Sequence, residues 1–582
     1  MENQRLGRLV LVIYPLQGHA TPVLQLGDVL HSKGFAITIA HTRFNPPNPS
    51  NHPHFSFLLL PDNLPYSDTS QTPSVDDFEA INRDCHAPLQ ELLELKEQRV
   101  DCQVVGIIFD SLMYFAATVA DHIKIPRLVF MTSNAAFYQA FAAIPRLMAE
   151  GFFPFQDSML HEIVPQQYPL RFKDLPVLRE NMDMMQKLID LASNFQKFSA
   201  IILNTVDFLE QSSLLQLQQQ YQVPVFQVGP LSKLAPAIST SFLKEDSNCI
   251  AWLDNQTANS VLYVSKGSLS MSDSKELTET FWGLANSGQS FLWVVRPGSV
   301  SGSEWTEVLP KDFKEIIGER GLIVKWAPQK EVLTHSAVGG FWSHCGWNST
   351  MESLSEGVPM ICSPQFFDQK VIARYITHEW KVGLELDGEL ERGGIERCIR
   401  TLMVGKNGAE MRERATELKQ MTSVSIHEGE LKLVINKSQD CSQVENFHLL
   451  LNNKKKVVIQ IFTRSGPSFV HSNTVFILST SEQLSTHSCQ KNRLEEQNII
   501  QHSPNESNLT DSIWIKPTQE AKWNLSTCPL SDVTFLDNGR QFVWLFPSFG
   551  GLITVVALLF FRTSTFFLAL SGHFSTWLLS IF

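Results

Sequence analysis

The sequence has few of the features that mark a disulfide-stabilised, secreted or nucleic-acid-binding protein. Its nine cysteines are scattered from Cys85 to Cys528 with an odd total and no paired spacing, which indicates reduced thiols, and the spacing typical of zinc sites is absent. The net charge of −12 argues against nucleic acid as a partner. Pro15 interrupts the apolar run Leu9 to Leu16, so a secretory signal is not predicted and we expect a cytoplasmic protein.

The chain is too long for one ordinary hydrophobic core. Single cores stop growing at roughly 250 to 300 residues, and this chain has 582, so two domains and an additional segment are expected. A composition of 43% hydrophobic and 18% charged residues is typical of a globular protein.

Short apolar runs in the first part of the chain predict parallel strands covered by helices on both faces. They lie at Leu9 to Tyr14, Ala36 to Ala40, Val104 to Phe109, Arg127 to Met131 and Ala200 to Asn204. Between the first two runs, Pro22 can begin a helix and Gly34 can end it. This alternation predicts a first doubly wound, Rossmann-like α/β domain over residues 1–235.

A second alternation of the same kind follows a linker rich in Ser, Pro and Lys, over residues 236–250. Its apolar runs lie at Val261 to Val264, Phe291 to Val295, Gly321 to Val324 and Val338 to Ser343. They predict a second Rossmann-like domain over residues 251–430. Ligands of such sheets bind outside the carboxyl ends of the strands, so two facing domains would create a cleft between those ends.

The character of the chain changes from residue 431 to residue 582, where polar residues become common and periodicity fades. A mostly disordered or mis-spliced extension is the first interpretation. The alternatives are a membrane anchor formed by an apolar helix over residues 543–561, and an interaction segment. Membrane association is expected only through this tail.

The most informative segment is the 44-residue block from Trp326 to Gln369. It reads WAPQKEVLTHSAVGGFWSHCGWNSTMESLSEGVPMICSPQFFDQ. This block resembles the signature box of plant secondary-product UDP-glycosyltransferases, and the resemblance extends from about Arg8 to about Glu428, nearest to the terpenoid and hormone glucosyltransferases. It implies two facing Rossmann-like domains of the GT-B type, UDP-glucose as donor, a small-molecule acceptor, no cofactor, no metal and a monomer.

Part of the chemistry of the block can be read from its residues. After the strand that ends at Ser343, Gly346 permits a tight turn, and Asn348 with Ser349 can start a helix. The free N–H groups of a helix start attract an anion, so a diphosphate belongs there. His344, just ahead of the turn, can add a hydrogen-bond donor.

Other side chains of the block suit the remaining parts of a uridine sugar. Trp326 offers a flat face for the base, Gln329 and Glu352 can bond ribose hydroxyls, and Asp368 with Gln369 can bind sugar hydroxyls. The family resemblance assigns these same roles.

The resemblance also adds Ala327 and Trp347 to the substrate-binding set. It favours glucose, because family members with Gln at the position of Gln369 usually prefer glucose, and glucuronic-acid users often have Arg where Trp347 stands. The alternative for any one of these residues is an ordinary place in the core or in a turn.

A general base for the acceptor hydroxyl is expected at His19, in a loop after the first strand. Asp110 ends another strand of the same sheet and could accept the other ring N–H of the imidazole. The catalytic histidine of the family and its aspartate partner match these two positions, which implies single displacement with inversion. A solvated turn residue and a helix cap are the alternatives.

Four further residues bear on the substrates. Thr132 and Ser268 match family positions that contact the glucose or phosphates of the donor. Lys266 stands where the family usually has an aromatic residue, and the bulk of Phe367 can narrow the sugar or acceptor side. The acceptor pocket is expected from the variable stretch Phe152 to Met182 and from aromatic residues of the first domain, namely Tyr114, Phe115, Phe137 and Tyr138.

Three functions therefore compete: a UDP-glucose-dependent glucosyltransferase, a nucleotide-sugar-binding protein without activity, and a nucleotide-sugar hydrolase or epimerase. The first is favoured by the 44-residue block. The sequence does not choose among a flavonoid, a terpenoid and a hormone as acceptor.

Overall fold

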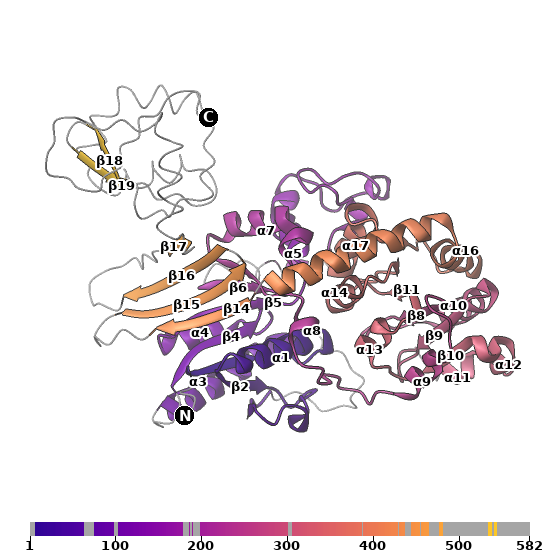
Figure 1. Ribbon diagram of the computed structural model, residues 1–582, viewed down its shortest axis with the longest axis horizontal. Helices are drawn as coiled ribbons and strands as arrows, with labels where there is room; N and C mark the ends of the chain where they lie inside the picture. The colour runs from indigo at the N-terminus through magenta and orange to yellow at the C-terminus, as the bar shows by residue number, and fades with distance from the viewer. Residues whose placement is uncertain are drawn as a thin grey trace, which may run out of the picture. The chain divides into compact units, whose positions relative to one another are not determined.

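The structure is a computed structural model, and it describes residues 6–62, 75–97, 103–177, 185, 186, 189, 198–300, 305–386, 388–428, 430–436, 444–453, 455–464, 476–480, 534–537 and 540–543. The chain divides into two compact units, Met1–His427 and Glu428–Phe582 (Figure 1).

The first half of unit Met1–His427 is built on a seven-stranded parallel sheet in the order β3-β2-β1-β4-β5-β6-β7. Its strands are β1 (Arg8–Val12), β2 (Ala36–His41), β3 (Ser56–Leu59), β4 (Val104–Asp110), β5 (Arg127–Met131), β6 (Ala200–Leu203) and β7 (Val225–Gln227). Side chains on β1, β2, β4, β5 and β6 are mostly buried, because helices cover the sheet, whereas the edge strand β3 is largely exposed. The helices are α1 (Gln17–Ser32), α2 (Val75–Asp84), α3 (His86–Glu97), α4 (Phe115–His122), α5 (Ala135–Ala149), α7 (Asp207–Tyr221) and α8 (Leu231–Leu234).

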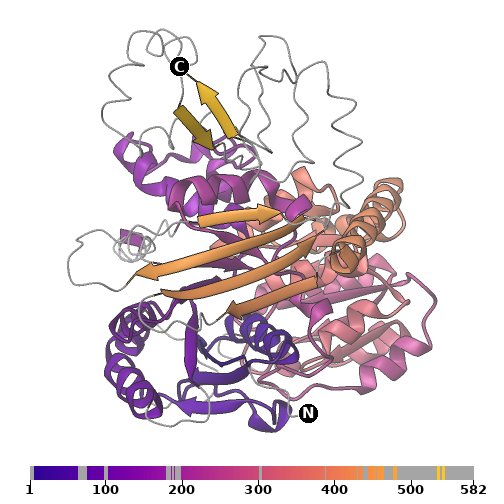
Figure 2. The same cartoon turned by 60° about the vertical axis from the view of Figure 1, so that its left-hand side comes forward.

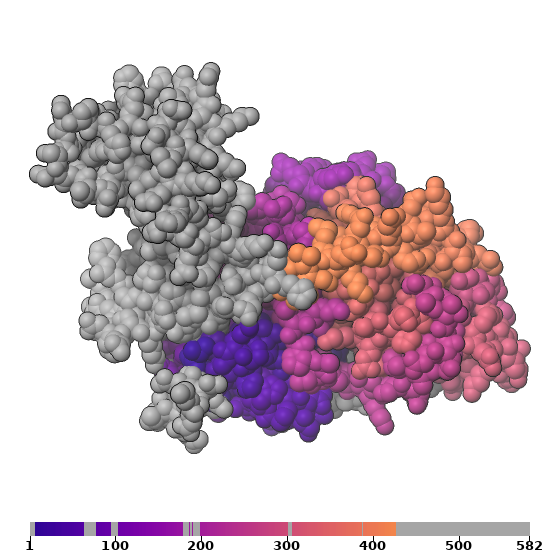
Figure 3. All heavy atoms as spheres, in the orientation of Figure 1, coloured from indigo at the N-terminus to yellow at the C-terminus, as the bar shows by residue number. Residues whose placement is uncertain are grey.

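The second half carries a six-stranded parallel sheet in the order β10-β9-β8-β11-β12-β13 (Figure 2). Its strands are β8 (Val261–Ser265), β9 (Ser290–Val294), β10 (Gly321–Val324), β11 (Val338–Ser343), β12 (Met360–Cys362) and β13 (Gly383–Glu385). The helices are α9 (Asn248–Asp254), α10 (Ser274–Ser287), α11 (Trp305–Val308), α12 (Phe313–Ile317), α13 (Gln329–Thr334), α14 (Trp347–Glu356), α15 (Asp368–Arg374), the π-helical turn η6 (Tyr375–Glu379), α16 (Arg392–Met403) and α17 (Lys406–Glu428). Helices α16 and α17 lie at the surface of this half (Figure 3).

The strand order reverses at the equivalent position in each of the two sheets. The chain winds outward from the first strand to one edge and then returns to the other side of it, so the reversal falls between β1 and β4 and between β8 and β11. In doubly wound sheets, ligands bind at this switch point, outside the carboxyl ends of the strands. The topology therefore predicts two ligand-binding edges, one for each sheet.

Several expected elements are confirmed with their bounds, namely the strands Arg127–Met131, Gly321–Val324 and Val338–Ser343. The first helix is different, because it begins at Gln17 rather than at Pro22, with the N–H groups of His19 and Ala20 donating to Leu16 O. Pro22 thus lies inside the helix. The short edge strands β3, β7, β12 and β13 were not anticipated.

Unit Glu428–Phe582 contains antiparallel strands, which the expectation of a tail without regular structure did not include. Strands β14 (Glu430–Asn436), β15 (Val444–Asn453), β16 (Lys455–Arg464) and β17 (Phe476–Thr480) form one sheet, and β18 (Thr534–Asp537) pairs with β19 (Arg540–Val543). Runs such as VVIQIF in β16 are rich in β-branched residues, which favour strands.

Within the part of the chain that the structure describes, no helix has both the length and the apolar character needed to cross a bilayer. The apolar segment 543–561 lies outside the described residues, apart from Val543 at the end of β19.

Candidate active site

A cavity of about 1300 Å³ opens between the two sheets of unit Met1–His427. It is lined by residues from the switch points of both sheets and from the segment between the two halves, including Ala237 to Ser241. Most of the predicted site residues border it: His19, Thr132, Ser268, Trp326, Ala327, Gln329, His344, Trp347, Asn348, Ser349, Glu352, Asp368 and Gln369. Asp110 lies behind His19 and is fully buried.

His19 and Asp110 form a hydrogen-bonded pair at the switch point of the first sheet. The distance from His19 Nδ1 to Asp110 Oδ2 is 2.8 Å, and the N–H of Leu112 donates to Asp110 Oδ1 at 2.9 Å. Both carboxylate oxygens are therefore held in place. Thr132 Oγ1 lies 3.1 Å from the same ring nitrogen of His19. With Nδ1 facing the carboxylate, the other ring nitrogen of His19 is left for a substrate.

The surroundings of His19 change its basicity. Burial lowers the pKa of this imidazole, but the charge and hydrogen bond of Asp110, with a smaller contribution from Asp368, outweigh burial and raise the pKa above its ordinary value. The side chain is 24% exposed, which leaves it accessible from the cavity. An imidazole of this kind can take a proton and keep the resulting charge beside a carboxylate.

At the switch point of the second sheet, a tight turn joins β11 to α14. The left-handed residue of this turn is Cys345, with φ 66°, whereas Gly346 has φ −61°, so the expected role of Gly346 as the turn-permitting residue is wrong. Glycine is required there for another reason, because a Cβ atom on Gly346 would collide with the ring of His344. A Cβ on Gly267 would lie 2.6 Å from the same ring. Burial lowers the pKa of His344 to about 4, so the ring is neutral near pH 7.

Helix α14 begins at Trp347, and its first turn faces the cavity through Asn348 and Ser349. Gly346 at the N-cap position makes no side-chain cap, so the first N–H groups have no side-chain acceptor at that position. The first turn holds no acidic residue, which keeps the positive end of the helix dipole available to an anion.

Asn348 also connects the second half to the first helix. Its Nδ2 donates to Gly18 O at 2.7 Å. Pro22 has no N–H, so the helical bond from residue 22 to the carbonyl of residue 18 cannot form, and this carbonyl is open to a donor from elsewhere. The internal proline therefore creates the acceptor that Asn348 uses, one residue before His19.

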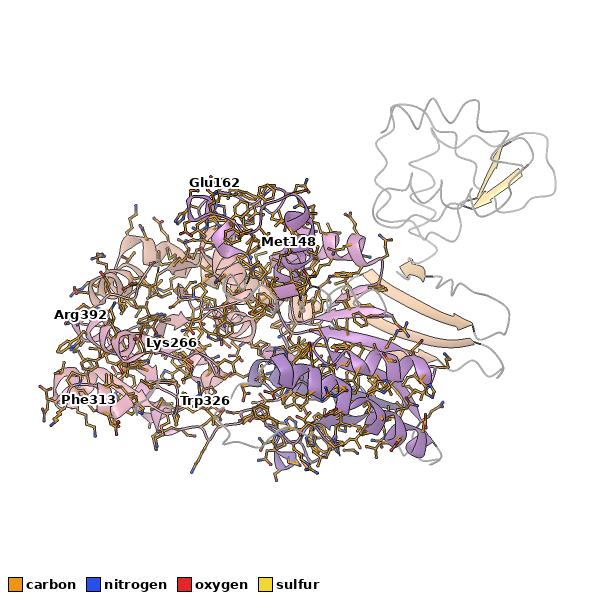
Figure 4. The ribbon with its side chains drawn as sticks, turned by 180° about the vertical axis from the view of Figure 1, so that it is seen from behind. Met148, Glu162, Lys266, Phe313, Trp326 and Arg392 are labelled. Carbon is orange, nitrogen blue, oxygen red and sulfur yellow. The ribbon has the colours of Figure 1, made fainter. Side chains whose placement is uncertain are left out.

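The residues expected at the ribose form a connected group. Gln329 Nε2 donates to Ser349 Oγ at 2.9 Å and to Glu352 Oε2 at 2.8 Å. Burial raises the pKa of Glu352. Trp326, labelled in Figure 4, donates its indole N–H to Ser241 Oγ at 2.7 Å, which fixes its ring at the cavity wall.

Asp368 and Gln369 are the first two residues of helix α15 and line the cavity. Ser133 Oγ donates to Asp368 Oδ2 at 2.7 Å, so a residue of the first half orients this carboxylate. Burial raises the pKa of Asp368. Gln369 Oε1 accepts the N–H of Gln365 at 2.9 Å, which directs its oxygen to the loop. Phe367 precedes the pair with φ 49°, a strained conformation for a bulky residue.

Two predicted residues occupy more internal positions. Trp347 is 3% exposed and donates its indole N–H to Asn204 O at 2.8 Å, so it also binds the two halves together. Ala327 is 4% exposed and reaches the cavity wall beside Trp326. Ser268 borders the cavity after β8. Lys266, labelled in Figure 4, donates from Nζ to Ser272 Oγ at 3.2 Å.

Sequence reasoning missed several lining residues. Ser133 and the segment Ala237 to Ser241 lacked a motif, because their role depends on the approach of the two halves. Among the aromatic residues expected at the acceptor, Phe137 and Tyr138 line the cavity, whereas Phe115 packs in the core. Residues 178–182 of the expected variable stretch lie outside the described residues.

Comparison with known proteins gives the same fold and a family. Residues 182–421 match the family model described as UDP-glucoronosyl and UDP-glucosyl transferase. The chain is 46% identical over 457 residues to UDP-glycosyltransferase 76E1 of Solanum lycopersicum, covering 78% of this chain and 93% of that protein. It is 43% identical over 428 residues to flavonol 3-O-glucosyltransferase UGT76E12 of Arabidopsis thaliana, covering 72% and 93% respectively.

Solved structures agree with this assignment. The structure of Phytolacca americana UGT2 complexed with UDP-2fluoro-glucose and pterostilbene matches with a TM-score of 0.61 and 28% identity, over 73% of this chain and 96% of that one. Os79 from O. sativa in complex with UDP matches with a TM-score of 0.61 and 26% identity, over 72% and 96%. With its two facing Rossmann-like sheets of the GT-B type, the chain belongs to the plant UDP-glycosyltransferase family and is an enzyme that transfers sugar from a UDP-sugar.

Proposed function

We propose that this enzyme transfers glucose from UDP-glucose to a hydroxyl or carboxyl group of a small, apolar plant metabolite, with inversion at the anomeric carbon. The observation that carries the proposal is the His19–Asp110 pair, which opens into the same cavity as the start of helix α14. A base and a diphosphate site that border one cavity are what a single displacement requires.

His19 acts as the general base. Its Nδ1–H donates to Asp110, so the lone pair on Nε2 can remove the proton of the acceptor as its oxygen bonds to the anomeric carbon. The Asp110 carboxylate then stabilises the imidazolium, in agreement with the raised pKa of His19. The bond to UDP breaks in the same step, and its electrons go to the leaving diphosphate.

The diphosphate lies at the start of α14, where backbone N–H groups and the helix dipole stabilise the charge that develops on the leaving group. His344 is held between two glycines as a neutral ring beside this place and can donate one hydrogen bond. The contact from Asn348 to Gly18 brings this helix start close to His19, which places the leaving group and the base within one site.

Asp368 and Gln369 select the sugar. The half-buried Asp368 carboxylate accepts from Ser133 and can accept a further sugar hydroxyl. The oxygen of Gln369 is bound to the loop at Gln365, so its NH₂ group is the part that can donate to the sugar. This donor–acceptor pair suits the neighbouring hydroxyls of glucose.

The acceptor is expected to be flat and apolar. The first half contributes apolar and aromatic side chains to the cavity wall, namely Tyr14, Phe78, Leu112, Phe137 and Phe141, and the ring centroid of Tyr14 lies 5.4 Å from that of His19. Such walls bind ligands mainly through apolar burial and aromatic stacking. The pterostilbene in the Phytolacca americana structure and the flavonol in the name of UGT76E12 are acceptors of this chemical class.

The test is acceptor-dependent release of UDP, measured over a panel of phenolic, terpenoid and carboxylic acceptors. The wild type should release UDP only with an acceptor present, which separates transfer from a hydrolase and from a binding protein. His19→Ala should keep UDP binding by calorimetry and lose about 10²- to 10⁴-fold in turnover. His122→Ala, on an exposed side chain of α4, is the matched control. Undiminished turnover in His19→Ala would refute the assignment.

A further inference from the structure

A second cluster of chemically reactive side chains lies away from the cavity, between helix α1 and the loop that precedes β3. Asp28 on α1 is buried, and its Oδ1 lies 3.3 Å from His52 Nδ1 and 2.8 Å from His54 Nε2. The ligand atoms of the three residues all lie within 4.8 Å of one another. Spacing along the chain did not reveal this group, because the aspartate and the histidines come from separate segments.

We propose that Asp28, His52 and His54 bind one divalent transition-metal ion, with Zn²⁺ as the leading choice. Neutral imidazole and carboxylate are ligands that zinc accepts, at metal–ligand distances of about 2.0 to 2.2 Å. Tetrahedral ligands at such distances lie roughly 3.3 Å apart. The Asp28–His52 pair already has this separation, and the Asp28–His54 pair would need to widen by about half an ångström.

The rings are held in place before an ion binds. His52 stacks on Phe55 with a centroid distance of 4.9 Å and an interplanar angle of 2°. His54 packs against Phe55 in a T-shaped arrangement, with the ring centroids 4.4 Å apart. The turn before them is capped by Asn48, whose Oδ1 accepts the N–H of Ser50. A preorganised ligand set lowers the entropic cost of binding.

The cluster has an open side and a candidate fourth ligand. The side chains of Asp28 and His52 are 2% and 1% exposed, but that of His54 is 26% exposed, so an ion can enter there. His31 lies three residues after Asp28 on α1, and its ring centroid is 4.4 Å from that of His54. His31 or water would complete four-coordination.

The charge balance favours a cation at this place. A buried carboxylate is costly without a positive partner, and the partners that the structure gives Asp28 are the ring nitrogens of two imidazoles. A divalent ion supplies the positive charge. It would also fasten α1, which carries His19 in its first turn, to a loop whose Asn51 Nδ2 donates to Ser239 O at 2.8 Å. The proposed role is therefore structural.

The test uses the full chain without a histidine tag, freed of metal with a chelator and titrated with ZnCl₂ by calorimetry. The chain has 17 histidines, so specificity is judged from variants. The wild type should bind one Zn²⁺ at this site and show a higher Tm with zinc. His54→Gln and Asp28→Asn should weaken this binding by at least about tenfold, because loss of even an outer partner of a metal site costs 10- to 100-fold. His122→Gln, whose side chain is 59% exposed on α4, should bind as the wild type does.

Visible absorption of bound Co²⁺ gives a second measurement, because its spectrum reports the coordination geometry. A tetrahedral spectrum that is lost in His54→Gln supports the proposal. Equal zinc binding in the wild type and in His54→Gln, or no zinc-dependent change in Tm, overturns it. Since His54 is partly exposed, its variant should fold even if Asp28→Asn does not.

Discussion

Replacement of Asp110 by Asn tests how the base is tuned, because it removes one charge and preserves the shape of the side chain. Asn Oδ1 can still accept the N–H of Leu112, so Nδ2 would then face His19. An NH₂ group there favours the tautomer in which Nδ1 is the acceptor and Nε2 carries the proton. The nitrogen that should remove the acceptor proton then has no free lone pair.

The magnitude follows from the interaction that is lost. The His19–Asp110 contact is one buried hydrogen bond to a charged group, 2.8 Å long, and such bonds contribute about 1.5 to 3 kcal/mol. If this stabilisation is largest when His19 is protonated in the transition state, kcat/KM should fall by roughly 10- to 150-fold. Binding of UDP alone should be unchanged, because Asp110 lies behind His19 in the first half.

The pH profile provides the decisive measurement. The Asp110 carboxylate raises the pKa of His19, and the neutral imidazole is the active form, so wild-type kcat/KM should fall as pH drops through this raised pKa. Without the carboxylate the pKa of His19 falls, so the decline of kcat/KM on the acid side of the profile should begin at lower pH. UDP release at acceptor concentrations well below KM, measured from pH 5 to 9, gives the profile of kcat/KM. Asp121→Asn, at a side chain that is 64% exposed, is the control. If Asp110→Asn shows the same pH dependence and the same kcat/KM as the wild type, Asp110 does not tune His19.

Two further substitutions test the donor side. Ser133→Ala removes the 2.7 Å hydrogen bond to Asp368, so the KM for UDP-glucose should rise by about 10- to 100-fold while binding of UDP without the sugar is retained. Equal losses of affinity for UDP-glucose and for UDP would contradict the sugar-orienting role. Gly346→Ala places a Cβ against the ring of His344, so calorimetry should show UDP affinity reduced by at least about tenfold. The control is Gly393→Ala, whose added Cβ would lie 3.6 Å from its nearest neighbouring atom and which should bind UDP normally. Unchanged affinity in Gly346→Ala would mean that the turn can relax.

Much of the fold could be predicted from local patterns. Strand β5 and strand β11 are continuous apolar runs bounded by polar residues, and such runs are buried in parallel sheets. Helix α1 shows where local patterns fail. Pro22 is a common first residue of a helix, yet here the helix starts at Gln17 and includes it, because Leu16 O accepts two N–H groups ahead of the proline.

The candidate site could be predicted only in part, for a similar reason. His19 follows β1 and Asp110 ends β4, and these strands lie on either side of a switch point, so topology alone places the two residues together. Ser133 and Ser241 have no such signal, because their contacts to Asp368 and Trp326 arise from the approach of the two halves. The cluster of Asp28, His52 and His54 was missed because two histidines in a loop indicate a metal site only once helix α1 places a carboxylate beside them.

The proline inside helix α1 has a consequence for the movement of the enzyme. Any separation of the two halves would break the bond from Asn348 to Gly18 O, and Pro22 has no N–H to replace it. Opening must therefore expose a backbone oxygen to water, and closing must strip that water away. Because this oxygen belongs to the peptide unit next to His19, such a movement would change the environment of the base through a single bond.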